Sequence, residues 1–445
     1  MEDEPQSKRR LLQQKHTAAG IHAPLRVFHP SSSPRREDAD RSYFQSYSHI
    51  GIHEQMIKDR VRTDAYRDAI MRHQNLISDK VVMDVGCGTG ILSIFCAQAG
   101  ARRVYAVEAS EIAIQIIAFI INSKTSTANA EIVMRDNNLS DKVIILHGRV
   151  ESCGTYDMQD IEIEEKVDVI ISEWMGYILL YENHGQTFEF YIPLNCARPL
   201  IPIVLVQSML TSVIFARDKW LKPGGLILPS HATIYMAPFT YDEMYESTIN
   251  FWRNVYGINR SLGVSAMIPH AKLCAFEEPA IETIGGENIL TWPSEIKYLD
   301  CYTVAARDLE SITTEYRFRS LVQAPLHGFA FWFDVEFNGP AVVPSESHSQ
   351  LTDGSSSFNS SNGSSHRKKR VKSDQVIVLS TSPEEAPTHW QQTLLYLYEP
   401  IEVKQDQIIE GSVTLAQCKE NSRFMNIQLQ YRTGGQSFVK ESVLR

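Results

Sequence analysis

A short apolar run that ends in closely spaced glycines constrains the fold most strongly. Residues 81–85 read Val-Val-Met-Asp-Val, residues 86–90 read Gly-Cys-Gly-Thr-Gly, and residues 91–99 contain no glycine or proline. This order predicts a buried strand, a tight turn and a helix. Glycines in such a turn let backbone N–H groups approach a ligand, since no Cβ obstructs them. Alone, however, the glycine pattern is a weak signal.

The next predicted strand adds evidence that the turn binds a nucleoside-like ligand. Residues 103–108 form a second β-branched run that ends in Glu108, about 20 residues after the turn, where an acidic side chain can accept hydrogen bonds from both ribose hydroxyls. The glycine spacing is Gly-x-Gly-x-Gly, which is tighter than the Gly-x-Gly-x-x-Gly associated with a pyrophosphate. The two features together favour S-adenosyl-L-methionine over NAD as the cofactor.

Further apolar runs at residues 143–146 and 167–171 are separated by longer segments, which predicts a doubly wound, Rossmann-like α/β domain with a parallel sheet. Glu173 follows the last of these runs, so it should stand at the carboxyl edge of the sheet, where such folds bind ligands. Glu182 lies in the same aromatic, apolar loop. Burying two carboxylates in such a loop costs free energy unless a cation lies between them. A planar guanidinium can pair with both carboxylates through several N–H donors, so the loop predicts an arginine ligand.

The remainder of the chain predicts a second domain and several irregular segments. From about residue 230, runs that alternate between apolar and polar residues predict a β-sandwich or β-barrel. Helices are expected from Tyr43 on, with a break near Gly51. The predicted organisation is a disordered tail at 1–41, a methyltransferase-type α/β domain at 42–229, and a β-barrel domain at 230–445 with a helical arm at about 241–275 and a disordered loop at about 339–374.

Composition excludes several classes of protein. The 445 residues carry a formal net charge of −10, which offers no general attraction for nucleic acid or anionic membrane. The 7 cysteines form no Cys-x-x-Cys pair, so neither a disulfide framework nor a zinc site is predicted, and a reducing compartment is expected. No apolar run is long enough to span a bilayer. The basic run 367–372 fits either a nuclear address or a solvated charge cluster.

Four motifs in a fixed order resemble the protein arginine N-methyltransferase family, over nearly the whole of residues 43–445. They are Gly-Ile-His-Glu at 51–54, Asp-Val-Gly-Cys-Gly-Thr-Gly at 84–90, Ser-Glu-Trp-Met-Gly-Tyr at 172–177 and Thr-His-Trp at 388–390. The resemblance implies transfer of methyl groups from S-adenosyl-L-methionine to arginine in proteins such as histones. It also implies a homodimer, chromatin-related substrates and a nuclear or cytoplasmic location.

The resemblance assigns roles to individual residues. It implies asymmetric dimethylation, because methionine occupies position 56. Taken alone, His53 or His389 would more often be a structural histidine, and Arg62 a surface residue. The catalytic residues that it implies are Glu173, Glu182 and His389, and the cofactor-binding residues are His53, Arg62, Gly86, Gly88, Glu108 and Glu151.

Two segments depart from the family pattern. Residues 183–207 separate Glu182 from Ser-Met-Leu at 208–210, and the prolines at 193, 199 and 202 prevent this segment from simply lengthening a helix. Residues 116–130 interrupt the region after Glu108. Both segments look like translated intervening sequence. An alternative function is therefore a catalytically impaired, splice-variant-like scaffold. A small-molecule methyltransferase is a weaker alternative, since it would need neither paired glutamates nor a β domain.

Overall fold

The computed structural model describes residues 47–110, 112, 141–151, 161, 163–181, 209–253, 264–340, 376–418 and 424–444. Some of the predictions fall on other residues. The predicted tail at 1–41, both insertions at 116–130 and 183–207, nearly all of the loop at 339–374, and Glu182 lie outside the described residues.

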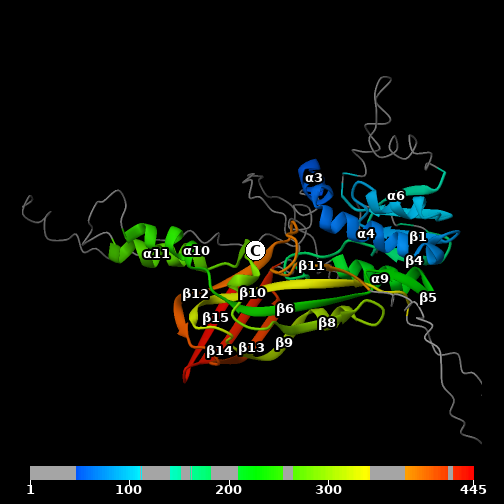
Figure 1. The fold of residues 1–445 in the computed structure, drawn as a ribbon. Coiled ribbons are helices and arrows are strands. Elements are labelled where there is room, and N and C mark those ends of the chain that lie inside the picture. The colour runs from blue at the N-terminus through cyan, green and yellow to red at the C-terminus, as the bar shows by residue number, and fades with distance from the viewer. Residues whose placement is uncertain are drawn as a thin grey trace, which may run out of the picture. The chain divides into compact units, whose positions relative to one another are not determined.

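A five-stranded parallel sheet forms the first domain (Figure 1). Its central strand is fully buried, as a β-branched run covered on both faces should be. The strand order reverses direction between β1 and β4, and ligands bind at such a switch point, beyond the carboxyl ends of the strands. In spatial order the strands are β3 (Val143–His147), β2 (Arg103–Glu108), β1 (Val81–Val85), β4 (Val167–Ile171) and β5 (Leu221–Leu228).

The helices of this domain include the one predicted after the glycine turn. The expected break near Gly51 is confirmed, because Tyr47 is helical, Ser48 and His49 are not, and α3 begins at Ile50. A second break, which was not predicted, follows at Asp59. Gly51 lies in the first turn of α3, where its N–H donates to the His49 ring. Asp59 is extended and caps the next helix by accepting from the Arg62 N–H at 3.0 Å. The helices are α3 (Ile50–Lys58), α4 (Arg60–Arg72), α5 (Gln74–Ile77), α6 (Ile91–Gln98) and α9 (Met209–Trp220).

Two antiparallel sheets form the second domain, which confirms the predicted barrel-type fold (Figure 1). Burial alternates along β14, as the period-two pattern predicts for a strand with one face on the core. The first sheet contains β7 (Ala280–Glu282), β12 (Gln392–Val403), β10 (Ala324–Phe337), β6 (His231–Phe239) and β8 (Ser294–Asp300), with β11 (Ile377–Ser380) paired to β10. The second contains β15 (Gln436–Leu444), β14 (Met425–Thr433), β13 (Ile408–Gln417) and β9 (Ser311–Arg319).

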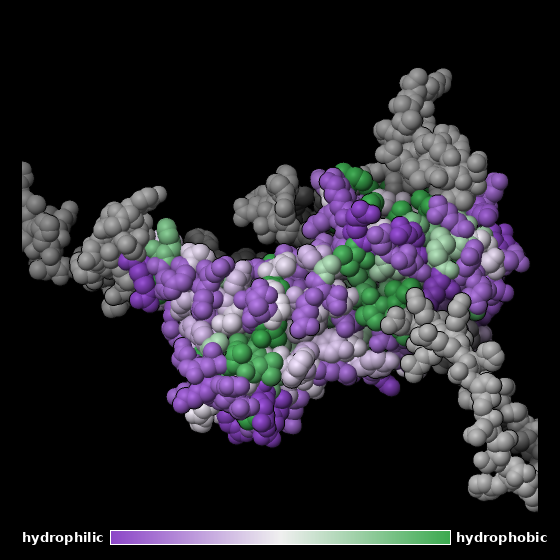
Figure 2. All heavy atoms as spheres, viewed as in Figure 1, coloured by the Kyte–Doolittle hydropathy of each residue, from purple (hydrophilic) through white to green (hydrophobic). Residues whose placement is uncertain are grey.

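Helices also occupy the described part of the predicted arm. They are α10 (Asp242–Thr248), η1 (Asn250–Arg253) and α11 (Val264–Phe276). Phe251 is 50% exposed. Hydrophilic residues cover most of the molecular face seen in Figure 2. Within the described part of the chain, no helix has both the length and the apolar character that crossing a membrane requires.

Candidate active site

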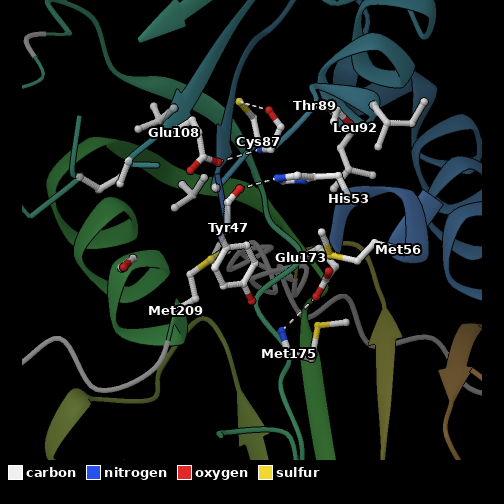
Figure 3. A pocket seen from close by; sticks show the side chains of 18 of the residues that line it. Tyr47, His53, Met56, Cys87, Thr89, Leu92, Glu108, Glu173, Met175 and Met209 are labelled. Atoms are coloured by element: carbon white, nitrogen blue, oxygen red, sulfur yellow. Dashed lines mark hydrogen bonds between the residues drawn. The ribbon is translucent and has the colours of Figure 1, made fainter. Parts of the chain in front are cut away.

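One pocket brings together residues from distant parts of the sequence, at the carboxyl ends of β1, β2 and β4 (Figure 3). The N-terminal helices and the β domain also contribute to its walls. Eight of the nine predicted site residues line it, namely His53, Arg62, Gly86, Gly88, Glu108, Glu151, Glu173 and His389. The ninth, Glu182, lies outside the described residues.

The glycine turn and Glu108 form one hydrogen-bonded unit. Gly86 and Gly88 have positive φ angles of 72° and 52°, a conformation that glycine adopts without steric cost. The Gly88 N–H donates to Glu108 Oε2 at 2.8 Å, and the Ser110 N–H donates to Oε1 at 2.7 Å. Because each carboxylate oxygen offers two lone pairs, Glu108 can still accept bonds from ligand hydroxyls.

The N-terminal segment and the residues after β3 also line the pocket. The His53 ring lies against the glycine turn, and its Nε2 is 2.7 Å from the Tyr47 carbonyl oxygen (Figure 3). Glu151 Oε1 is buried and has no hydrogen-bond partner among the described residues. A buried, open acceptor in the same pocket as the glycine turn suits a ligand that carries N–H or O–H donors, such as a nucleoside. The residues present therefore fit a nucleoside cofactor.

Glu173 forms a buried ion pair with Arg62. The Arg62 Nε and one terminal nitrogen lie 3.2 Å and 3.1 Å from Glu173 Oε2. The side chains of Arg62 and Glu173 are only 6% and 9% exposed. Glu173 Oε1 accepts the Met175 N–H at 3.2 Å (Figure 3). One lone pair on Oε1 is thus available for a further cation in the pocket.

His389 reaches the pocket from the β domain and is held by Asp59, a residue that sequence reasoning missed. Asp59 Oδ2 accepts the His389 backbone N–H at 2.9 Å and lies 2.7 Å from Nδ1 of the ring. Burial tends to raise the pKa of Asp59, but the hydrogen bonds from His389 and from the backbone of Arg62 and His389 outweigh burial and lower this pKa. Asp59 is therefore an anion that orients the imidazole. The available sequence signal was an acidic residue just before a helix.

The loop after Glu173 turns sharply at Ile178 and Leu179. Ile178 and Leu179 have positive φ angles of 47° and 67° and are buried. A β-branched residue at positive φ is unusual, and such strain gathers at functional sites. The turn is closed by the Gly176 N–H, which donates to the Leu179 carbonyl at 2.9 Å.

Asp84, at the end of the central strand, should make stability depend on pH. It is fully buried, and burial raises its pKa to about 7 in spite of the hydrogen bond from Ser93 Oγ at 2.6 Å. This folded pKa exceeds the unfolded value of about 3.9. The contribution of Asp84 to the free energy of unfolding is therefore fully present below about pH 4. It is lost as the pH rises to about 7, by roughly 1.4 kcal/mol per pH unit. Denaturant unfolding between pH 4 and pH 8 should show this loss in the wild type and not in Asp84→Asn. Parallel pH profiles would contradict it.

Comparison with known families defines the class of protein first. A family model described as "Ribosomal protein L11 methyltransferase (PrmA)" matches residues 69–176. A second, described as "Arginine methyltransferase oligomerization subdomain", matches residues 230–353 and 367–436. The α/β domain with its glycine-turn pocket is thus a methyltransferase domain, and the β domain is of the type found in arginine methyltransferases.

Relatives and solved structures then identify the family. The chain is 57% identical over 93% of its length to "Probable protein arginine N-methyltransferase 6" of Arabidopsis thaliana, of which it covers 84%. It is 37% identical over 90% of its length to "Protein arginine N-methyltransferase 6" of Xenopus laevis, of which it covers 94%. Among solved structures, the Trypanosoma brucei PRMT1 enzyme-prozyme complex with AdoHcy matches with a TM-score of 0.66 at 30% identity, covering 90% of this chain and 100% of that one. This chain belongs to the protein arginine N-methyltransferase family.

Proposed function

We propose that this chain methylates arginine in basic proteins such as histones, giving monomethylarginine and asymmetric dimethylarginine. Protein arginine N-methyltransferase is its family activity, and S-adenosyl-L-methionine is its cofactor. The observation that carries the proposal is Glu173, a buried carboxylate that lines the same pocket as the glycine turn. The histone-like substrate follows from charge, since an acidic chain with a carboxylate-lined pocket favours basic segments.

The residues of the pocket divide into those for the cofactor and those for arginine. When bound, S-adenosyl-L-methionine supplies an electrophilic methyl group. Glu108 would accept the ribose hydroxyls, and Glu151, with its open buried oxygen, would accept from the adenine side. Gly86 and Gly88 provide close backbone approach. His53 and Arg62 would complete the site, with Arg62 available to the cofactor carboxylate.

The arginine pocket must both hold and orient the substrate guanidinium. The lone pairs of the guanidinium are delocalised and its pKa exceeds about 12, so the substrate nitrogen is a poor nucleophile without help. We assign Glu173 and Glu182 to gripping it so that one terminal nitrogen faces the methyl group, with positioning supplying much of the acceleration. His389, oriented by Asp59, is assigned to removing the proton from the methylated nitrogen.

The product specificity rests on Met56, which lines the pocket and whose carbonyl accepts from Arg62 at 3.2 Å. Members of the family that dimethylate asymmetrically carry methionine at this position, so by resemblance asymmetric product is the expectation. Mass spectrometry of methylated histone peptides should find both methyl groups on one nitrogen. Detection of only symmetric dimethylarginine would contradict this part of the proposal.

The alternative function, an impaired scaffold, depends on residues 183–207. A matched experiment compares the full chain with a variant that lacks 183–207, using cofactor binding and methyl transfer to arginine-rich peptides as the two readouts. Activity in the full chain supports the enzyme. Cofactor binding without transfer, restored by the deletion, supports the scaffold instead.

We further propose a homodimer that acts in the nucleus, the cytoplasm or both. The match to an oligomerization subdomain supports assembly, and the half-exposed Phe251 on the arm offers an apolar contact. The basic run 367–372 supports nuclear import. Light scattering of the purified chain should give twice the mass of one chain, and a monomer would contradict the dimer.

Gly86→Ala tests whether the glycine turn forms the cofactor site. Gly86 has φ +72°, and an added Cβ would lie 2.6 Å from the Met209 Cε atom inside the pocket. We expect affinity for S-adenosyl-L-methionine, measured by calorimetry, to fall by about tenfold, the equivalent of 1.4 kcal/mol. Gly224→Ala is the matched control, since Gly224 has φ +73° but nothing within 4 Å of an added Cβ. Equal affinities in the two variants would exclude the turn from the site.

A further inference from the structure

The backbone that carries Glu173 is anchored on its N-terminal side. The Ser172 N–H donates to the Leu228 carbonyl at 3.1 Å, and Ser172 Oγ donates to the Val85 carbonyl at 2.7 Å. These two bonds tie the loop to neighbouring strands of the parallel sheet. The Ser172 carbonyl, directly before Glu173, accepts its bond from outside the sheet, from the Tyr66 hydroxyl at 2.9 Å.

Tyr66 is placed to hold that carbonyl rigidly. It is completely buried, and its ring meets Phe337 of β10 edge-on, with centroids 4.9 Å apart. The same hydroxyl lies 3.6 Å from Met175 Sδ, so it contacts the loop on both sides of Glu173. Burial and the nearby charge of Glu173 raise the pKa of Tyr66 well above its usual value, so the hydroxyl is protonated and can donate at neutral pH.

One helix face supplies both supports of Glu173. Arg62 and Tyr66 lie four residues apart on α4 and so point to the same side of the helix. Arg62 pairs with the carboxylate, while Tyr66 bonds the backbone just before it. A loss of either contact lets the carboxylate move relative to the pocket, and small displacements of a positioning group are costly to catalysis.

We propose that Tyr66 is a positioning residue for arginine methylation, which fixes Glu173 through the Ser172 carbonyl without touching cofactor or substrate. This inference rests on the proposed function, because it assigns Tyr66 to the carboxylate that grips the substrate guanidinium. A buried tyrosine elsewhere in the core would use its hydroxyl only for stability, whereas the Tyr66 hydroxyl also fixes the position of Glu173.

Tyr66→Phe removes the hydroxyl and keeps the ring. We expect kcat to fall by about tenfold or more while the KM for S-adenosyl-L-methionine changes by less than about twofold. Tyr316→Phe is the matched control, since the buried Tyr316 hydroxyl donates to the Gln430 carbonyl at 2.8 Å in the β domain. It should cost comparable stability and leave kcat unchanged. A kcat for Tyr66→Phe equal to that of Tyr316→Phe overturns the proposal.

A double-mutant cycle on stability makes the test independent of turnover. The cycle uses Tyr66→Phe and Glu173→Gln, alone and combined. If the hydroxyl holds Glu173, the unfolding equilibrium constant of the double variant should differ by about threefold or more from the value expected for two independent substitutions. Additive effects overturn the positioning role. Non-additive effects in a chain that transfers no methyl group to arginine would support the coupling of Tyr66 to Glu173 and overturn the proposed function.

Discussion

Replacing Arg62 by methionine is expected to lower the free energy of unfolding by about 3–5 kcal/mol, because it leaves the buried carboxylate of Glu173 without its partner. Denaturant unfolding followed by circular dichroism measures the change. Arg60→Met is the matched control on the same helix, since the Arg60 side chain is 89% exposed and should contribute less than about 1 kcal/mol.

A second substitution separates the charge effect from a packing effect. Glu173→Gln in the Arg62→Met background removes the stranded charge, so more than half of the lost stability should return. If Arg62→Met is as stable as Arg60→Met, or if the double variant recovers nothing, the buried ion pair does not have the energetic role described.

Glu173→Gln alone should have the largest effect on activity. An amide cannot balance the charge of the substrate guanidinium, and we expect kcat/KM for an arginine peptide to fall by about 10²–10³-fold, as for loss of a preorganised electrostatic contact. Affinity for S-adenosyl-L-methionine should change much less, because Gly86, Gly88 and Glu108 are untouched. Steady-state kinetics and calorimetry measure the two quantities.

Glu164→Gln is the control for that substitution, since Glu164 is exposed between β3 and β4, outside the pocket-lining residues. It should retain wild-type kinetics. A Glu173→Gln enzyme that keeps more than about half of the wild-type kcat/KM would contradict the role assigned to the carboxylate, whereas loss in both variants would point to a general defect in folding.

Local pattern was enough to predict the parallel sheet and the position of Glu173. Strand periodicity, the glycine turn and the rule that ligands bind at the carboxyl edge all depend on residues close in sequence. Gly88, Glu108 and Glu173 could therefore be expected on one side of the sheet from the sequence alone, and they do line one pocket.

Contacts between distant segments could not be predicted in this way. Asp59 and His389 are 330 residues apart, and Tyr66 and Ser172 are 106 apart. Nothing in the sequence around any of these four residues indicates its partner. Only packing of the helices against the strands brings the partners together.

Transfer of methyl groups to arginine is the activity on which the roles of Glu173, His389 and Tyr66 all depend. The most direct test incubates the full chain with radiolabelled S-adenosyl-L-methionine and mixed histones, followed by acid hydrolysis and amino-acid analysis. Label recovered as monomethylarginine and dimethylarginine is the predicted result. Label on another amino acid, or none from a chain that binds the cofactor, would contradict it.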